Sequence, residues 1–295
     1  MSETAASSTF RRWWPFVCLC VFTAVRWSVG ESVPASLPSL WSTALGCLTA
    51  CLIALTVATL RHEPKLLLRD GLASFAAGSL MLGGPLLGVL LGTRFIDASA
   101  LTLALALVPV VVAVARPAFH RGDRQELAGR LWPGIAAVAG MLLLLPQPAL
   151  SGALPWIALG AAPIMAGVGA MWLRTRAGSA SWRAALALAA GMLVAVAVAF
   201  VRHLPVSHAT LLASAFDAAT AGLTVLTLFR VGGTRWSAQF VLVPLVVIAE
   251  GVLLLRPHLD PRTIAGLALM LFAAVFLLLP PKMDDAEFGV PVSDE

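Results

Sequence analysis

The C-terminal stretch that ends at Pro280 constrains the fold more than any other part of the sequence. It contains two apolar runs, over residues 236–255 and 263–280, on either side of a short polar hinge over 256–262. An α-helix rises about 1.5 Å per residue, so each run is about long enough to cross the hydrocarbon core of a bilayer. The runs are continuous rather than alternating, which favours membrane helices over the strands of a barrel.

An earlier stretch, over residues 107–146, repeats this plan. Each stretch has a proline inside its first apolar run (Pro109 or Pro244), then a polar hinge, then a glycine-containing run that ends in leucines and a proline. The first and last prolines are 37 positions apart in the earlier stretch and 36 in the later one. Such a repeat is a signal about the whole fold, and it is typical of transporters built from two related halves.

The composition extends this interpretation to the whole chain. Of the 295 residues, 59% are hydrophobic and 12% are charged, whereas soluble domains carry about 25% charged residues. We therefore expect an all-α integral membrane protein without a separate soluble domain. The first apolar run resembles a secretory signal, but Arg26 interrupts it and no clean small-residue cleavage site follows, so we expect an uncleaved first span.

The chain divides into ten predicted transmembrane helices, five in each half. Residues 1–12 form an N-terminal tail, 13–147 the first repeat, 154–280 the second repeat, and 281–295 an acidic C-terminal tail. Because five is an odd number, the second repeat is expected to be inverted relative to the first. The ten spans are 13–32, 39–60, 71–92, 97–116, 131–147, 154–174, 182–202, 209–229, 236–255 and 263–280.

The basic residues predict that both termini lie in the cytoplasm. In that orientation four basic residues, Arg94, Arg202, Arg256 and Arg262, fall in outer loops, and fifteen fall on the inner side. This bias explains the basic isoelectric point without a nucleic-acid partner. The fifteen are Arg11, Arg12, Arg61, Lys65, Arg69, Arg116, Arg121, Arg124, Arg130, Arg174, Arg176, Arg183, Arg230, Arg235 and Lys282.

Three charged residues, Arg26, Asp217 and Glu250, fall inside predicted spans and at a similar depth in the outer half of the membrane. A charge there costs at least about 2.5–3.5 kcal/mol unless it is paired or hydrated. One cation facing two carboxylates leaves one acid to bind a proton, which a proton-coupled carrier can use. Alternatively, Arg26 binds an anionic group of the substrate while a carboxylate binds an amine. A structural ion pair, or Arg26 extending to the outer headgroups, is the non-functional interpretation.

Four prolines, Pro85, Pro109, Pro163 and Pro244, lie inside predicted spans. Proline frees a backbone carbonyl and permits bending, so these positions are candidates for helix bending and gating. The alternative is that proline is simply common in membrane helices. The polar residues that could line a cavity are Thr43, Ser79, Thr102, Ser214, Thr220, Thr224 and Gln239.

The two proline-containing stretches, together with the basic loop over residues 60–70, resemble the drug/metabolite transporter superfamily and in particular its EamA-like branch of ten helices. The resemblance covers about residues 15–280. It implies a carrier in which helices of both halves line a central cavity while the fifth and tenth spans are peripheral. The sequence departs from the branch where Trp-Gly is common in the first helix and where Gly-Glu is common at the hinges.

We expect a secondary transporter of the inner or plasma membrane that moves a small organic metabolite by alternating access, driven by protons or by the gradient of the solute. No nucleotide-binding loop or H-E-x-x-H motif is present, and Cys18, Cys20, Cys47 and Cys51 match no zinc spacing. We therefore expect no enzyme activity, catalytic residue, metal or cofactor. Expected partners are the solute, membrane lipid and protons; a homodimer is left open. The alternative function is a membrane binding or scaffold protein on a degenerate transporter fold.

Overall fold

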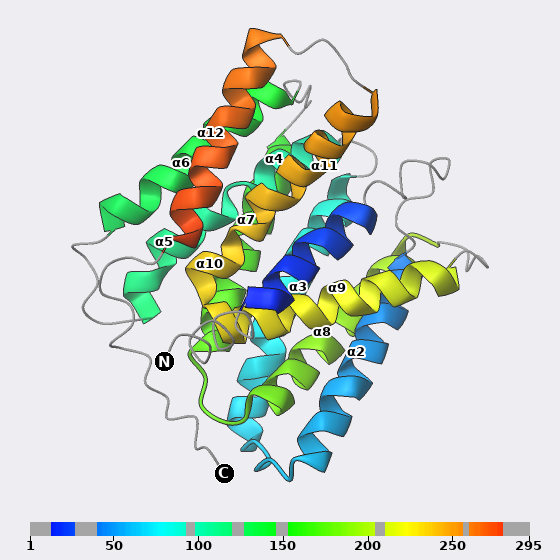
Figure 1. Ribbon diagram of the computed structural model, residues 1–295. Coiled ribbons are helices and arrows are strands. Elements are labelled where there is room, and N and C mark those ends of the chain that lie inside the picture. The colour runs from blue at the N-terminus through cyan, green and yellow to red at the C-terminus, as the bar shows by residue number, and fades with distance from the viewer. Residues whose placement is uncertain are drawn as a thin grey trace, which may run out of the picture.

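A computed structural model describes residues 13–26, 40–92, 98–119, 127–145, 153–203, 210–255 and 260–279, and all regular elements in these ranges are helices. The fold is therefore all-α over the described residues (Figure 1). A first helix spans Trp13–Arg26. The others are α2 (Leu40–Leu60), α3 (Leu68–Gly92), α4 (Ala98–Leu105), α5 (Val108–Phe119), α6 (Leu127–Leu144), α7 (Ala153–Arg174), α8 (Ala180–Val201), α9 (Thr210–Val231), α10 (Gly233–Ser237), α11 (Gln239–Leu255) and α12 (Pro261–Leu278).

Five helical stretches in the described residues are long and apolar enough to cross a membrane, and two shorter apolar helices, Trp13–Arg26 and Leu131–Leu144, accompany them. This agrees with an all-α membrane protein. The five stretches are Leu40–Leu60, Leu101–Phe119, Trp156–Arg174, Ala180–Val201 and Pro261–Leu278.

The helices pack through small residues and turn large apolar side chains outward. Alanine is the commonest buried apolar residue, whereas Ile53, Trp132, Ile157 and Phe276 are each about half exposed or more. Membrane helices have little hydrophobic drive to associate, so small residues that let backbones approach closely hold them together, while large side chains face lipid. The distribution of residue sizes is therefore that of a chain surrounded by hydrocarbon.

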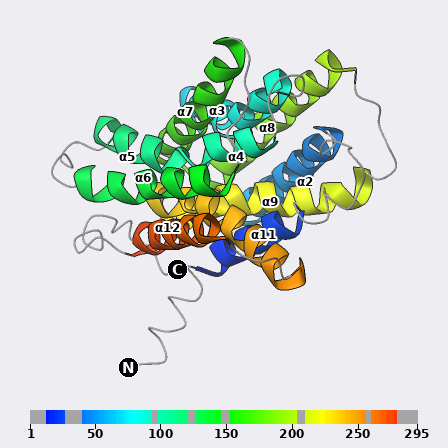
Figure 2. The same cartoon turned by 90° about the horizontal axis from the view of Figure 1, so that it is seen from above.

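Two groups of helices lie on opposite sides of the molecule (Figures 1 and 2). The pair α6 and α12 forms one side, and its backbones meet where Gly140 faces the carbonyl of Gly266. On the other side, α2 packs against α8 and α9, and α8 in turn packs against α3. The α6–α12 pair therefore lies at the edge of the molecule.

Two predicted spans contain an interruption between consecutive helices: the fourth between α4 and α5, and the ninth near its start, between α10 and α11. The fourth span is broken at Ala106–Leu107, where Leu107 N–H bonds to the carbonyl of Ala104 in a tighter turn. Pro109 follows at once, and it has no N–H with which to continue the helix. The ninth span begins as the short helix α10, and Ala238 separates α10 from α11.

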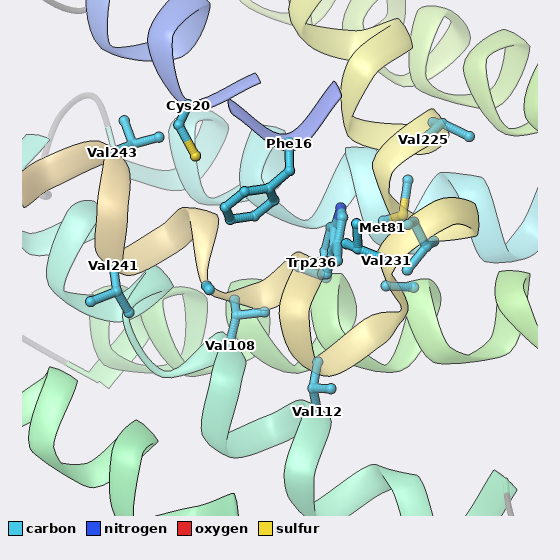
Figure 3. Packing of buried hydrophobic residues seen from close by; sticks show 14 of the residues in the cluster. Phe16, Cys20, Met81, Val108, Val112, Val225, Val231, Trp236, Val241 and Val243 are labelled. Atoms are coloured by element: carbon cyan, nitrogen blue, oxygen red, sulfur yellow. The ribbon is translucent and has the colours of Figure 1, made fainter. Parts of the chain in front are cut away.

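The side chain of Trp236 on α10 fills the centre of the larger hydrophobic cluster. It is 1% exposed, and its indole Nε1 donates a hydrogen bond to the carbonyl of Thr224 on α9 (3.1 Å). Figure 3 shows it among Val231 of α9, Val112 of α5 and Phe16 of the first helix. Elements far apart in the sequence therefore share one packed centre.

Candidate functional site

Asp217 on α9 is the centre of a polar network that joins three helices. One carboxylate oxygen, Oδ1, accepts a hydrogen bond from Nε of Arg26 at 3.1 Å, which is also an ion pair. The other, Oδ2, accepts hydrogen bonds from the hydroxyls of Ser42 (2.5 Å) and Thr43 (3.4 Å) at the start of α2. The network thus connects the first helix and α2 of one half of the chain with α9 of the other.

The two side chains of the ion pair are largely, but not fully, buried. The side chains of Arg26 and Asp217 are 18% and 13% exposed, and Ser42 is completely buried. Charge-assisted hydrogen bonds are about twice as strong as neutral ones, so these contacts hold the first helix and α2 against α9. Loss of the Asp217 charge would remove the main attraction that holds Arg26 against α9.

A glycine positions Asp217 against α2. A Cβ atom added to Gly46 would lie 2.7 Å from backbone and side-chain atoms of Asp217 and from the backbone of Ala218. Only a residue without a side chain lets the two helices approach this closely. The approach brings the Asp217 carboxylate within reach of the hydroxyls one turn earlier on α2.

Two of the three charged residues selected from the sequence therefore meet. The described partners of Asp217 are Arg26, Ser42 and Thr43, and Glu250 is not one of them. Glu250 is partly buried on α11, five residues before the end of that helix.

All four selected prolines lie inside helices, with different burial. Pro109 is the second residue of α5 and is buried, as is Pro163 in α7, whereas Pro85 in α3 and Pro244 in α11 are partly buried. Pro109 alone of the four directly follows a break between two helices.

The sequence did not reveal Ser42. A serine in an apolar helix usually bonds a carbonyl of its own helix, and Ser74 and Ser79 do so here, four residues back. Ser42 instead bonds a carboxylate 175 positions away. Its position beside Thr43, which the sequence marked as a candidate to line a cavity, was the available signal.

A second set of polar contacts joins the two halves at the other ends of these helices. Glu63, in the loop after α2, accepts a hydrogen bond from the hydroxyl of Ser181 on its Oε1 (2.9 Å) and another from the indole of Trp182 on its backbone carbonyl (3.3 Å). Both donors lie in the first turn of α8. Therefore α2 is fastened to α9 near its beginning and to α8 beyond its end.

Arg183 fixes the connection between α7 and α8. Its Nη1 donates hydrogen bonds to the carbonyls of Leu173, Arg174 and Arg176, and its guanidinium lies 4.7 Å from the ring centre of Phe229 on α9. The terminal carbonyls of a helix need such donors. Arg183 therefore has a structural role in addition to its part in the charge bias.

The described residues contain no group of three or more His, Cys, Asp or Glu side chains that could hold a metal ion. The four cysteines, Cys18, Cys20, Cys47 and Cys51, are free thiols within the first helix and α2. The polar network around Asp217 is consequently the candidate functional site that the described side chains define.

Comparison with known proteins gives the fold alone. No family model matches the sequence, and no curated protein matches it. Among solved structures 26 chains match. One of them, described as the crystal structure of a protein, has a TM-score of 0.63 and 15% sequence identity over 90% of this chain and 98% of its own. Over its described residues the chain is thus all-α, with helices that can cross a membrane, and a similar architecture exists in a solved structure.

Proposed function

We propose that the protein is a secondary transporter of the inner or plasma membrane, built from two inverted five-helix repeats and similar to EamA-like carriers. It moves a small organic solute by alternating access, and protons bound at Asp217 couple to the movement. The observation that carries this proposal is the Asp217 network, because it places an ionisable group between the two halves, where a carrier needs its switch.

The pattern of helix contacts supports two repeats related by a two-fold axis. Exchange of the halves replaces α2 by α8, α3 by α9, α6 by α12 and the first helix by α7. The contact between α2 and α9 then becomes the contact between α8 and α3, and both are extensive; α2 with α8 and α6 with α12 become themselves. The contact between α3 and α7 becomes that between α9 and the first helix, where the Arg26–Asp217 pair lies.

Individual close contacts follow the same exchange. A Cβ on Gly46 would lie 2.7 Å from Ala218, and a Cβ on Gly78 would lie 2.7 Å from the Cβ of Ala187. Ala187 follows Gly46 by 141 positions (187 minus 46), and Ala218 follows Gly78 by 140 (218 minus 78). One closely packed pair is therefore the counterpart of the other.

A second pair of contacts has the same offsets. Gly222 approaches Ala50 at 3.6 Å, and Gly191 approaches Leu82 at 3.1 Å, both measured from a Cβ added to the glycine. Gly191 follows Ala50 by 141 positions (191 minus 50), and Gly222 follows Leu82 by 140 (222 minus 82). Agreement of two independent pairs supports repeats that begin about 140 residues apart.

The proposed coupling uses the asymmetry of this arrangement. The position equivalent to Asp217, 140 residues earlier, is Ala77, so one half alone supplies the carboxylate. When Asp217 binds a proton it loses its charge and Arg26 is released, which allows the first helix and α2 to separate from α9. Loss of the proton restores the contacts. The Glu63 contacts join the other end of α2 to α8 and separate in the other half of the cycle.

The test is solute flux in proteoliposomes that are loaded with a broad mixture of metabolites and carry an imposed pH gradient. Mass spectrometry compares the wild type with Asp217→Asn and Glu250→Gln. Asparagine keeps the size of the side chain but cannot release a proton, so we expect protein-dependent movement of one class of compound whose dependence on pH is lost in Asp217→Asn.

Other results have separate meanings. Flux that depends on pH in the wild type and in Asp217→Asn, but not in Glu250→Gln, would move coupling to Glu250. Flux without any pH dependence would indicate a facilitator that is not coupled to protons. A folded protein that moves no compound would contradict transport and favour the binding or scaffold function.

A further inference from the structure

The two broken helices meet at their breaks. The first helix of each pair contacts a helix of the other pair, α5 with α10 and α4 with α11. Ala106 at one break and Ala238 at the other are both completely buried in the same cluster. Figure 3 shows Val108, which begins α5, beside the ribbon of α10 and α11. The interruptions of the two halves therefore lie against each other inside the protein.

Gln239, the first residue of α11, has an unsatisfied amide at this crossing. The residue is 6% exposed, and its Nε2 is buried without a hydrogen-bond partner among the described residues. A buried donor without a partner costs about 1–3 kcal/mol. Such groups are rare in native proteins, and a catalytic role or a bound water or ion is among the recognised explanations for them.

The facing break supplies an acceptor. In a continuous helix the carbonyl of Leu105 would accept a hydrogen bond from the N–H of residue 109, but that residue is Pro109 and has no N–H. Leu105 ends α4, which contacts α11. A donor on α11 and a carbonyl on α4 without its usual intrahelical donor therefore lie on two helices in contact, and neither carries a formal charge.

We propose that the crossing of the two breaks is the solute-binding site of the transporter, with Gln239 as the residue that selects the solute. The inference rests on the proposed function. The Gln239 amide donates to an oxygen of the solute, and the Leu105 carbonyl accepts from an N–H or O–H of the same molecule. The solute class is a small polar molecule without net charge that carries both kinds of group.

The structure is closed at this site. Val108 and Ala238 are not exposed at all, so a solute enters when α10–α11 moves away from α4–α5. Pro109 lies one residue after the first residue of α5, and Pro244 lies five residues after the first residue of α11. Both prolines remove hydrogen bonds that would resist such bending. The helix breaks therefore serve both binding and movement.

The experiment measures the thermal stability of purified protein in detergent with a panel of probes: the twenty common amino acids, four nucleosides and four hexoses. The variant is Gln239→Leu. The control is Thr227→Val on α9, which also removes a buried polar atom without a described partner but lies outside the crossing. We expect a member of the panel to raise the Tm of the wild type and of the control. The Kd of that compound should be at least tenfold higher for Gln239→Leu than for the wild type.

Stability without a solute separates binding from a structural role. Removal of an unsatisfied amide leaves the Tm of Gln239→Leu equal to or above that of the wild type, whereas loss of a structural hydrogen bond lowers it. A lower Tm, a Kd that is unchanged in Gln239→Leu, or a panel that stabilises nothing would overturn the inference.

Failure of the inference can be told from failure of the proposed function. If a solute stabilises the wild type through Gln239 but is not moved in proteoliposomes, the result would support the binding site and contradict transport. If the wild type and Gln239→Leu move a solute with equal KM, the result would support transport and contradict the proposed binding site.

Discussion

Replacement of Gly46 by alanine tests the close approach of α2 and α9. The added Cβ would lie 2.7 Å from three atoms of Asp217 and Ala218, whereas ordinary contact begins at 3.4 Å, so the helices must separate by about 0.7 Å. Forcing extra atoms into a packed interface costs about 1–3 kcal/mol. The same shift lengthens the hydrogen bonds of Asp217 to Ser42 and Thr43, so the cost is expected in the upper part of this range.

The matched control is Gly160→Ala on α7, where an added Cβ meets no atom within 4 Å. Both substitutions gain the same helix propensity, about 1 kcal/mol, so the difference between the two variants isolates the packing cost. Unfolding in mixed micelles with increasing sodium dodecyl sulfate, followed by tryptophan fluorescence, measures it. Equal free energies of unfolding for Gly46→Ala and Gly160→Ala would refute the packing of α2 against α9.

Three further predictions concern other parts of the structure. Trp236→Ala removes a fully buried side chain and should lower the free energy of unfolding by about 3–5 kcal/mol, measured by the same titration; a loss below 1 kcal/mol would contradict its central place. Arg183→Leu leaves three carbonyls after α7 without their donor and should accelerate amide exchange in the first turn of α8, while exchange in α12 stays unchanged. Side-chain hydrogen bonding from Thr263 holds the pKa of the Asp260 carboxyl below its ordinary value of 3.8. This cap therefore stabilises α12 above pH 3.8 and is lost as the pH falls below it; a carbon NMR titration that places the pKa above 3.8 would contradict the cap.

The helices that cross the molecule without interruption were predictable from the sequence. The predicted spans 39–60, 154–174 and 182–202 correspond to Leu40–Leu60, Ala153–Arg174 and Ala180–Val201. Apolar length sets these boundaries, because a polar residue or a proline marks each end.

The breaks were not predictable in the same way. The sequence is apolar on both sides of Ala106, so hydropathy does not separate a continuous helix from an interrupted one there. Pro109 gave a signal for the first break, but nothing in the hydrophobic pattern distinguishes its effect from that of Pro163, which α7 accommodates without interruption. Tertiary packing, here the burial of Ala238 and Trp236, decides between the two outcomes.

The candidate site was predictable in part, for an electrostatic reason. Charges in a membrane helix need a partner, which made Arg26 and Asp217 a plausible pair from depth alone. The third charge, Glu250, has a similar predicted depth but is not among the described partners of Asp217. Depth along a helix axis does not specify the direction of a side chain around it, and that direction comes from the packing of Gly46 against α9.

The most direct test of the account is the accessibility of the crossing from both sides of the membrane. In a protein whose four native cysteines are replaced by alanine, Ala238→Cys is exposed to a membrane-impermeant thiol reagent in vesicles of either orientation. Alternating access through the crossing predicts that the thiol reacts in both orientations, and that a bound solute slows both reactions. Reaction in neither orientation, or in one alone, would contradict the account.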